Sequence, residues 1–250
     1  MRIIPVIDVR DGIAVHAVGG HRDYYRPVES AVSESSDPVR MLTVLKRRFQ
    51  IGHCYVADLN GLQHRKPAKC QLAEMSRVGV PLLIDVGVRT VEDIEDLQDV
   101  VVDRIILGSE TVPSLSFVRE CVTRFGADRL TFSVDMRDGA MLTENPDWQG
   151  MAPGELAGLV IEAGIRELIL LDLAAIGTGR GVSTLPLCRQ LRQRFSSLSV
   201  IVGGGIRSVS HLHELEQAGA DGALVATALH NGTITLTDFQ KFGSGRLRTA

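Results

Sequence analysis

Short apolar runs alternate with amphipathic segments along the whole chain. The apolar runs are rich in Val, Ile and Leu, as β-strands are, and lie at residues 3–9, 54–58, 81–86, 104–107, 130–135, 168–172, 199–202 and 222–225. The intervening segments predict helices, some of which begin after a capping side chain: 39–49 after Asp37-Pro38, 91–97 after Thr90, and 209–218 after Ser208. Short apolar strands that alternate with helices predict a parallel sheet buried on both faces.

The second half of the chain repeats the first. IPVIDVRDGIAVH at 4–16 is echoed by TFSVDMRDGAMLT at 131–143, which makes Asp8 and Asp135 equivalent positions. Further pairs follow in the same order: HCYVADLNG with ELILLDLAA, DVGVR with GGGIR, and IILGSET with ALVATAL. Self-similarity at a spacing of roughly 120 residues is typical of a duplicated unit. Duplication favours a single (β/α)8 barrel, an α/β TIM-barrel domain over 1–250 with half-barrels at about 1–127 and 128–250. The alternative, an open doubly wound sheet, is disfavoured because no GxGxxG follows the first strand.

Composition restricts the classes of partner. The 250-residue chain has a net charge of −3 and contains no block of Lys or Arg, so we expect no nucleic-acid partner. No apolar run approaches the ~18 residues of a membrane span, so we expect no membrane partner. The cysteines are far apart with no CxxC, which fits a reducing compartment better than a disulfide framework or a zinc site. We therefore expect a cytoplasmic protein without a metal ion. We further expect either a monomer or a small homo-oligomer.

Asp8 and Asp135 are the candidate catalytic residues. In a barrel of this kind, residues at the carboxyl ends of strands face the mouth, and the first and fifth strands stand on opposite sides of it. Two carboxylates across a small pocket can move protons on a sugar carbon, one ionised as base and the other protonated as acid. The plainer alternative is that each aspartate caps the loop after its strand, but the repeated context favours catalysis.

Small residues at equivalent strand ends predict two anion sites. One consists of residues after the third and fourth strands, Gly87, Arg89, Gly108 and Ser109. The other consists of residues after the seventh and eighth strands, Gly203, Gly204, Gly205 and Thr227. Glycines let backbone N–H groups approach an anion, although glycine also serves tight turns. Two opposed sites predict a phosphorylated small-molecule substrate with a phosphate at each end.

IIPVIDVRDG, FSVDMRDG, IILGSETV and IVGGGIRS together resemble ProFAR isomerase, the ribotide isomerase of histidine biosynthesis in the HisA/HisF family, over essentially the whole chain. The cyclase subunit of imidazole glycerol phosphate synthase is a more distant likeness. The resemblance implies a (β/α)8 barrel that performs an Amadori rearrangement of an aminoaldose to an aminoketose without metal or cofactor. It further implies Asp8 as general base, Asp135 as general acid, Trp148 as the residue stacked on the substrate's base, and Thr178 as a substrate-binding residue. A single tryptophan in a loop can also simply cover the barrel rim.

Several positions depart from the family pattern. Asp85 stands where a phosphate site usually has glycine, so its carboxylate would repel a phosphate, and Ala226-Thr227 replaces a Gly-Arg pair. After the sixth strand, Leu171 and Ile176 replace a threonine and an aspartate. These changes touch substrate recognition more than the catalytic pair. Three functions therefore stay open: ProFAR isomerase itself, a HisA-like paralogue acting on another phosphorylated small molecule outside histidine biosynthesis, and a non-catalytic metabolite-binding barrel.

The connection from Arg10 to Ser36 is long for a compact domain and contains the stretch GGHRDYYRP. We expect it to form a lid over the substrate, with Arg22 or Arg26 reaching an anion. We expect His16 to lie on a short β-ribbon in a structural or surface role. No lysine falls at the end of a predicted strand, which argues against Schiff-base chemistry.

Overall fold

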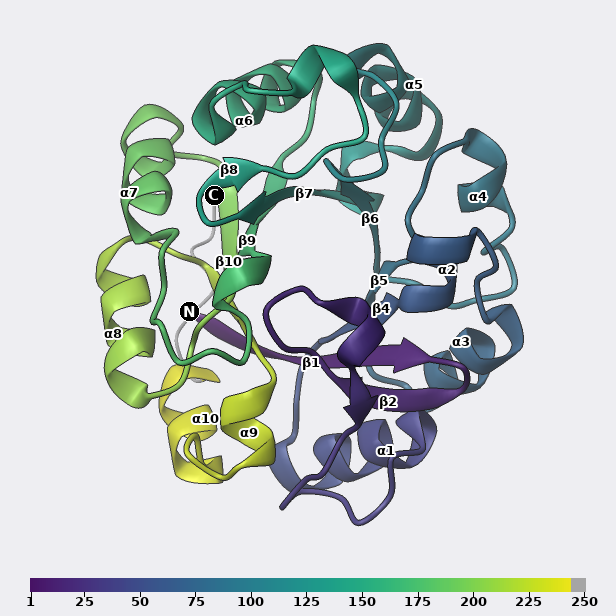
Figure 1. Cartoon of the computed structure of the whole chain (residues 1–250), viewed down its shortest axis with the longest axis vertical. Helices are drawn as coiled ribbons and strands as arrows, with labels where there is room; N and C mark the ends of the chain where they lie inside the picture. Colours follow the sequence, from purple (N-terminus) through teal and green to yellow (C-terminus); the bar gives the residue numbers. More distant parts are fainter. Residues whose placement is uncertain (244–250) are drawn as a thin grey trace.

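The computed structural model describes residues 1–243, in which parallel strands close into a barrel because β1 pairs with both β4 and β11. The barrel strands are β1 (Arg2–Arg10), β4 (Cys54–Asp58), β5 (Leu82–Asp85), β6 (Arg104–Gly108), β7 (Leu130–Arg137), β9 (Glu167–Asp172), β10 (Ser199–Gly203) and β11 (Gly222–Val225). Figure 1 looks into this ring of strands, with the helices around its outside. The predicted (β/α)8 barrel is confirmed.

Helices surround the barrel (Figure 1); α1 to α8 join its successive strands, and α9 and α10 follow the last strand. They are α1 (Pro38–Phe49), α2 (Leu59–His64), α3 (Lys69–Ser76), α4 (Val91–Glu95), α5 (Leu115–Phe125), α6 (Pro153–Glu162), α7 (Leu185–Arg194), α8 (Val209–Gln217), α9 (Thr227–His230) and α10 (Leu236–Gly243). The predicted caps are present, since Asp37 accepts hydrogen bonds from two helix N–H groups, and Thr90 and Ser208 each accept one. Such caps satisfy donors that the first turn of a helix leaves unpaired.

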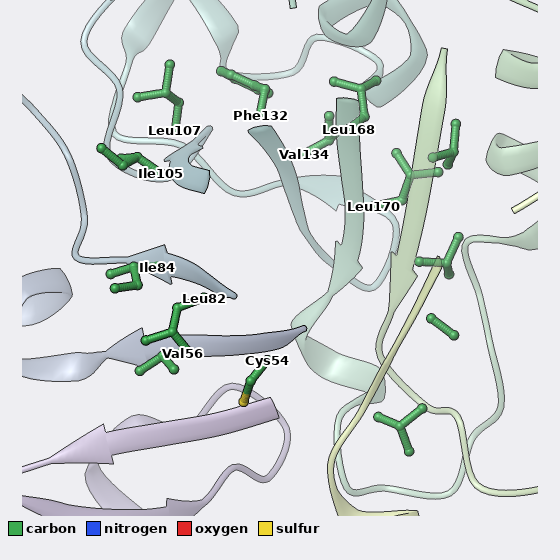
Figure 2. Close-up of a cluster of buried hydrophobic side chains, with 14 of the residues drawn as sticks. Cys54, Val56, Leu82, Ile84, Ile105, Leu107, Phe132, Val134, Leu168 and Leu170 are labelled. Carbon is green, nitrogen blue, oxygen red and sulfur yellow. The ribbon is translucent and has the colours of Figure 1, made fainter. Parts of the chain in front are cut away.

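Alternate residues of each strand pack into two different cores. Side chains such as Val56, Ile84 and Phe132 face outward and pack in one cluster with apolar residues of the helices (Figure 2). Their strand neighbours, including Leu83 and Ile106, fill the interior of the barrel. Because side chains of a strand point alternately to its two faces, a strand buried on both faces must be apolar throughout. The barrel interior is thereby packed below the strand ends.

Two matching hairpins follow equivalent strands. After β1 the chain returns as β2 (Ile13–His16), and after β7 it returns as β8 (Ala140–Met141). Each turn is an Asp-Gly pair with positive φ at both residues, 51° and 81° in the first turn and 50° and 77° in the second. Asp-Gly suits this geometry because glycine has no Cβ and aspartate tolerates the left-handed region. The β-ribbon that carries His16 is thus confirmed, and the hairpins hold Asp8 and Asp135 in equivalent settings.

Candidate active site

A cavity of about 280 Å³ opens at the carboxyl ends of the barrel strands. Asp8 on β1, Asp85 at the end of β5 and Asp135 on β7 all line it, so the sequence-predicted acidic residues come together. The connection between β2 and α1 closes part of the mouth, and its Arg22 and Tyr25 line the same cavity. The long connection therefore lies over the site, as expected for a lid.

Asp8 is half-buried at the end of β1. Burial raises the pKa of its carboxyl group to about 7. The Arg22 guanidinium opposes that rise by favouring the ionised form, and the Asp85 carboxylate adds to it. Near neutral pH, Asp8 is therefore divided between its ionised and protonated forms, which is the condition for a general base.

Asp135 is more deeply buried, at 6% exposure, and burial raises the pKa of its carboxyl group to about 8. A hydrogen bond from the Ser133 hydroxyl to Oδ1, 2.6 Å long, lowers that pKa, while Asp85 and Glu110 raise it. A Cβ on Gly108 would lie 3.0 Å from Asp135 Oδ2. Gly108 therefore leaves room for the acid, and Asp135 is mostly protonated at neutral pH.

Asp85 occupies the first predicted anion site with its own carboxylate. Oδ1 accepts the Gly87 N–H at 3.0 Å, and Oδ2 accepts the Tyr55 hydroxyl at 3.0 Å. Burial raises the pKa of Asp85 to about 6, and these two hydrogen bonds act in the opposite direction. The Ser109 hydroxyl is engaged as well, since it donates to the Leu142 carbonyl oxygen and accepts the Asp135 N–H.

Arg89 faces away from this cavity. Its guanidinium donates to the carbonyl oxygens of Gly87 and Leu62 and pairs with Glu144, with Nη2 3.1 Å from Oε1. Asp85 is therefore neither turned out of the cavity nor paired with Arg89. Gly87, Gly108 and Ser109 likewise do not line the cavity, and the donors of Gly87, Arg89 and Ser109 bind protein groups.

The second predicted anion site keeps its donors. Gly204, Gly205 and Thr227 line the cavity, while Gly203 ends β10 just below them. Within residues 1–243, no protein group accepts a hydrogen bond from the N–H of Gly204, Gly205 or Thr227. A Cβ on Gly205 would lie 1.9 Å from the Gly181 carbonyl oxygen, so only glycine permits this loop packing. His16 approaches the site from β2, with Nε2 3.0 Å from Thr227 Oγ1.

Trp148 and Thr178 also lie outside the cavity lining. Trp148 is 3% exposed and packs edge-on against Phe132, with ring centroids 6.3 Å apart, so it belongs to the core between strands and helices. Thr178 donates its hydroxyl to the carbonyl oxygens of Ala174 and Ala175, although its neighbour Gly177 lines the cavity. We therefore leave the Trp148 indole and the Thr178 hydroxyl out of the proposed site.

The lid is fastened by charged groups. Arg22 lies on a short 3-10 turn, and its Nη1 and Nη2 bind the two carboxylate oxygens of Glu110 at 2.7 Å and 2.6 Å. Arg10 donates to the carbonyl oxygens of Arg22 and Tyr25 from below. The expectation that Arg22 reaches an anion is thus met by a carboxylate of the protein itself, whereas Arg26 is exposed.

A family model described as histidine biosynthesis protein matches residues 2–235 of this chain. The chain belongs to the histidine biosynthesis protein family. An uncharacterized protein of Methanocaldococcus jannaschii is 32% identical over 246 residues, which cover 97% of this chain and 100% of that protein. The 1-(5-phosphoribosyl)-5-((5-phosphoribosylamino)methylideneamino) imidazole-4-carboxamide isomerase of Streptococcus thermophilus is 30% identical over 248 residues, 97% of this chain and 100% of its own. A Halobacterium salinarum protein of the same name is 30% identical over 241 residues, 95% of each chain.

Sequence reasoning missed three residues of this histidine biosynthesis family member. Tyr55, Tyr25 and Glu110 all line the cavity beside the aspartates. Glu110 directly follows Ser109 in a loop that was predicted to bind an anion. A carboxylate in that loop was the signal that could have identified Glu110 as a site residue. Tyr55 lies inside an apolar strand run, so nothing in the pattern distinguished its hydroxyl from that of a core tyrosine.

Residues 1–243 show neither a metal cluster nor a membrane helix. In this range no group of three or more His, Cys, Asp or Glu side chains is placed to hold a metal ion. Within the same described range, no helix has the length and apolar character needed to cross a bilayer.

Proposed function

We propose that the protein catalyses an aldose–ketose isomerisation, an Amadori rearrangement of a phosphorylated aminoaldose, with Asp8 as general base and Asp135 as general acid. The observation that carries the proposal is that these two carboxyl groups, from opposite strands of the barrel, line one cavity with pKa values raised toward neutrality. Perturbed titrating groups in a cleft are typical of catalytic acids and bases. Relatives named as isomerases support the reaction class.

The two aspartates differ in the way that the reaction requires. Asp135 has the higher pKa, so it holds the proton that it delivers to the ring oxygen as the sugar ring opens. The Arg22 guanidinium favours the carboxylate form of Asp8, which takes the proton from C2 of the opened sugar. Asp8 then returns its proton to C1 of the resulting enolamine, while the Asp135 carboxylate takes the proton of the 2-hydroxyl group, which gives the ketose and restores both carboxyl groups. The proton count is unchanged over the reaction.

A phosphate of the substrate belongs at the Gly204, Gly205 and Thr227 end of the cavity. The unpaired N–H groups there supply donors without the cost of breaking protein hydrogen bonds. The Arg207 side chain also lines this end. The reacting carbons then lie between this anchor and the Asp85 end of the cavity, with Asp8 on β1 and Asp135 on β7 at opposite sides of them.

The proposal is tested with an N-aryl 5-phosphoribosylamine in D₂O, followed by nuclear magnetic resonance. We expect conversion to the ketose and incorporation of deuterium from solvent. A protein that binds the compound without either change would be a metabolite-binding barrel, which overturns the isomerase proposal. Complementation of a histidine auxotroph that lacks ProFAR isomerase is a second assay, which tests whether the substrate is the histidine-pathway ribotide.

The pH dependence of kcat/KM is expected to be bell-shaped, with limbs near pH 7 and pH 8. On the acid side, protonation of Asp8, whose pKa is about 7, removes the base. On the alkaline side, loss of the proton from Asp135, whose pKa is about 8, removes the acid. The profile of kcat/KM reports groups of the free enzyme. Activity that stays constant from pH 5 to 10 would contradict this acid-base assignment.

Crystals grown or soaked in phosphate are expected to show the ion beside Gly204, Gly205 and Thr227. The physical reason is that these N–H groups are unpaired, whereas the Gly87 N–H already binds Asp85. The measurement is a difference electron-density map at both loops. Density found only beside Gly87 and Ser109 would contradict the assignment of the phosphate end.

A further inference from the structure

The end of the cavity beside β5 and β6 is filled by protein carboxylates in the place of a ligand anion. Asp85 is 6% exposed and takes both the Gly87 N–H and the Tyr55 hydroxyl, each at 3.0 Å. These are the donors that a phosphate would need at this loop. A phosphate entering here would have to displace a hydrogen-bonded, buried carboxylate that carries the same sign of charge.

The two arginines near this end of the cavity, Arg22 and Arg89, are already paired with carboxylates of the protein. Arg22 holds both oxygens of Glu110 in a bidentate pair, with 17% and 20% of the two side chains exposed. Arg89 is paired with Glu144 and with carbonyl oxygens. A bidentate guanidinium–carboxylate pair is geometrically matched and costly to exchange for another anion. Neither arginine offers a free charge to a second phosphate.

The opposite end differs in each respect. Arg207 lines the cavity, and no carboxylate of residues 1–243 forms an ion pair with it. It stands beside Gly204 and Gly205, whose N–H groups have no acceptor within the same described range. Among residues 1–243, one end of the cavity thus has a cation without an ion-pair partner and N–H donors without an acceptor. At the other end, carboxylates already bind the donors and cations around them.

We infer that the substrate is a monophosphate, held by its phosphate at Gly204, Gly205 and Arg207, with a neutral or cationic end facing Asp85 and Glu110. The inference rests on the proposed isomerase function and names the substrate class for it. Asp85 is then a specificity-determining residue. Its carboxylate excludes a second phosphate from the loop at 85–89, whereas the equivalent loop at 203–207 has glycine in that position and admits a phosphate. An amine or hydroxyl at the distal end of the substrate would donate to these carboxylates.

The test measures affinity by calorimetry in an Asp8→Asn background, so that the ligand is not turned over. The probes are the bisphosphorylated ribotide named for the relatives and the two monophosphates obtained by removing either phosphate from it. We expect at least one monophosphate to bind more tightly than the bisphosphate by roughly tenfold or more, since like charges in a partly buried site repel strongly. Arg207→Gln is expected to weaken the binding of that monophosphate.

Asp85→Gly is expected to reverse the preference in favour of the bisphosphate. Asp85→Asn keeps the side-chain volume while removing the charge, and serves if the glycine variant fails to fold. Asp99→Asn, an exposed position between α4 and β6, is the control for the change in net charge and is expected to leave the preference unchanged. Bisphosphate binding as tight as that of both monophosphates before any change at Asp85 would overturn the inference. That result would leave the proposed isomerase function intact. Conversely, a parent protein that binds the monophosphate more tightly but does not convert it would overturn the proposed function and not the substrate preference.

Discussion

Asp8→Asn and Asp135→Asn are each expected to lower kcat by about 10²- to 10⁴-fold, the usual contribution of a positioned acid or base. An asparagine at Asp8 cannot accept the C2 proton, and an asparagine at Asp135 cannot deliver a proton to the ring oxygen. The measurement is the rate of ketose formation at pH 7.5, with the double variant included. Because the pair acts in one reaction, we expect the double variant to lose less than the product of the two single effects.

Stability provides the control for these variants. In the folded protein the pKa of Asp135 is raised from 3.8 to about 8, so between these pH values the folded state holds a proton that the unfolded state has lost. The free energy of unfolding therefore falls as pH rises through this window. Asp135→Asn removes that penalty and is expected to be no less stable than the parent at pH 8. A variant that unfolds there would make its lost activity uninformative, and a folded variant with parental activity would refute the assignment.

Asp85→Gly is expected to raise kcat/KM on the bisphosphorylated ribotide by up to about a thousandfold. Two like charges about 4 Å apart repel by roughly 4 kcal/mol at an effective dielectric constant of about 20, which corresponds to that factor in affinity. The substitution also frees the Gly87 N–H and the Tyr55 hydroxyl for the incoming phosphate. The measurement is a steady-state assay of parent and variant on the same ribotide.

A parent protein with ordinary activity on the ribotide, about 10⁴ to 10⁸ M⁻¹s⁻¹ in kcat/KM, would contradict this prediction. It would restore ProFAR isomerase as the function, with Asp85 tolerating a phosphate. Asp99→Asn again controls for net charge. Tyr55→Phe is a second control, because it removes one donor of the Asp85 carboxylate while leaving its charge in place.

The sequence by itself determined the barrel and its acidic pair. Eight apolar strands that alternate with capped helices predict a sheet buried on both faces. This pattern can be read from the sequence because it depends on the local periodicity of apolar residues. The repeated VIDVRDG and SVDMRDG segments placed Asp8 and Asp135 at equivalent strand ends. The Asp-Gly turns behind them also follow from local geometry, since few other residue pairs accept positive φ twice.

Only the tertiary structure decided what the other site residues do. Gly87 and Ser109 were expected to bind a phosphate, but the Gly87 N–H binds the Asp85 carboxylate two residues before it. The Ser109 hydroxyl binds Leu142 and Asp135, which are 33 and 26 positions away. Trp148 was expected near the substrate, and packing against Phe132 places it in the core.

The charges at the mouth show the same division. The sequence marks Arg22 as a residue able to reach an anion, but it does not show that Glu110, 88 positions away, is that anion. Such pairings depend on which strand ends meet around the barrel mouth. The sequence identifies candidate residues of the site. The closure of the barrel decides which of these residues face one another and which hydrogen-bond donors have no protein acceptor.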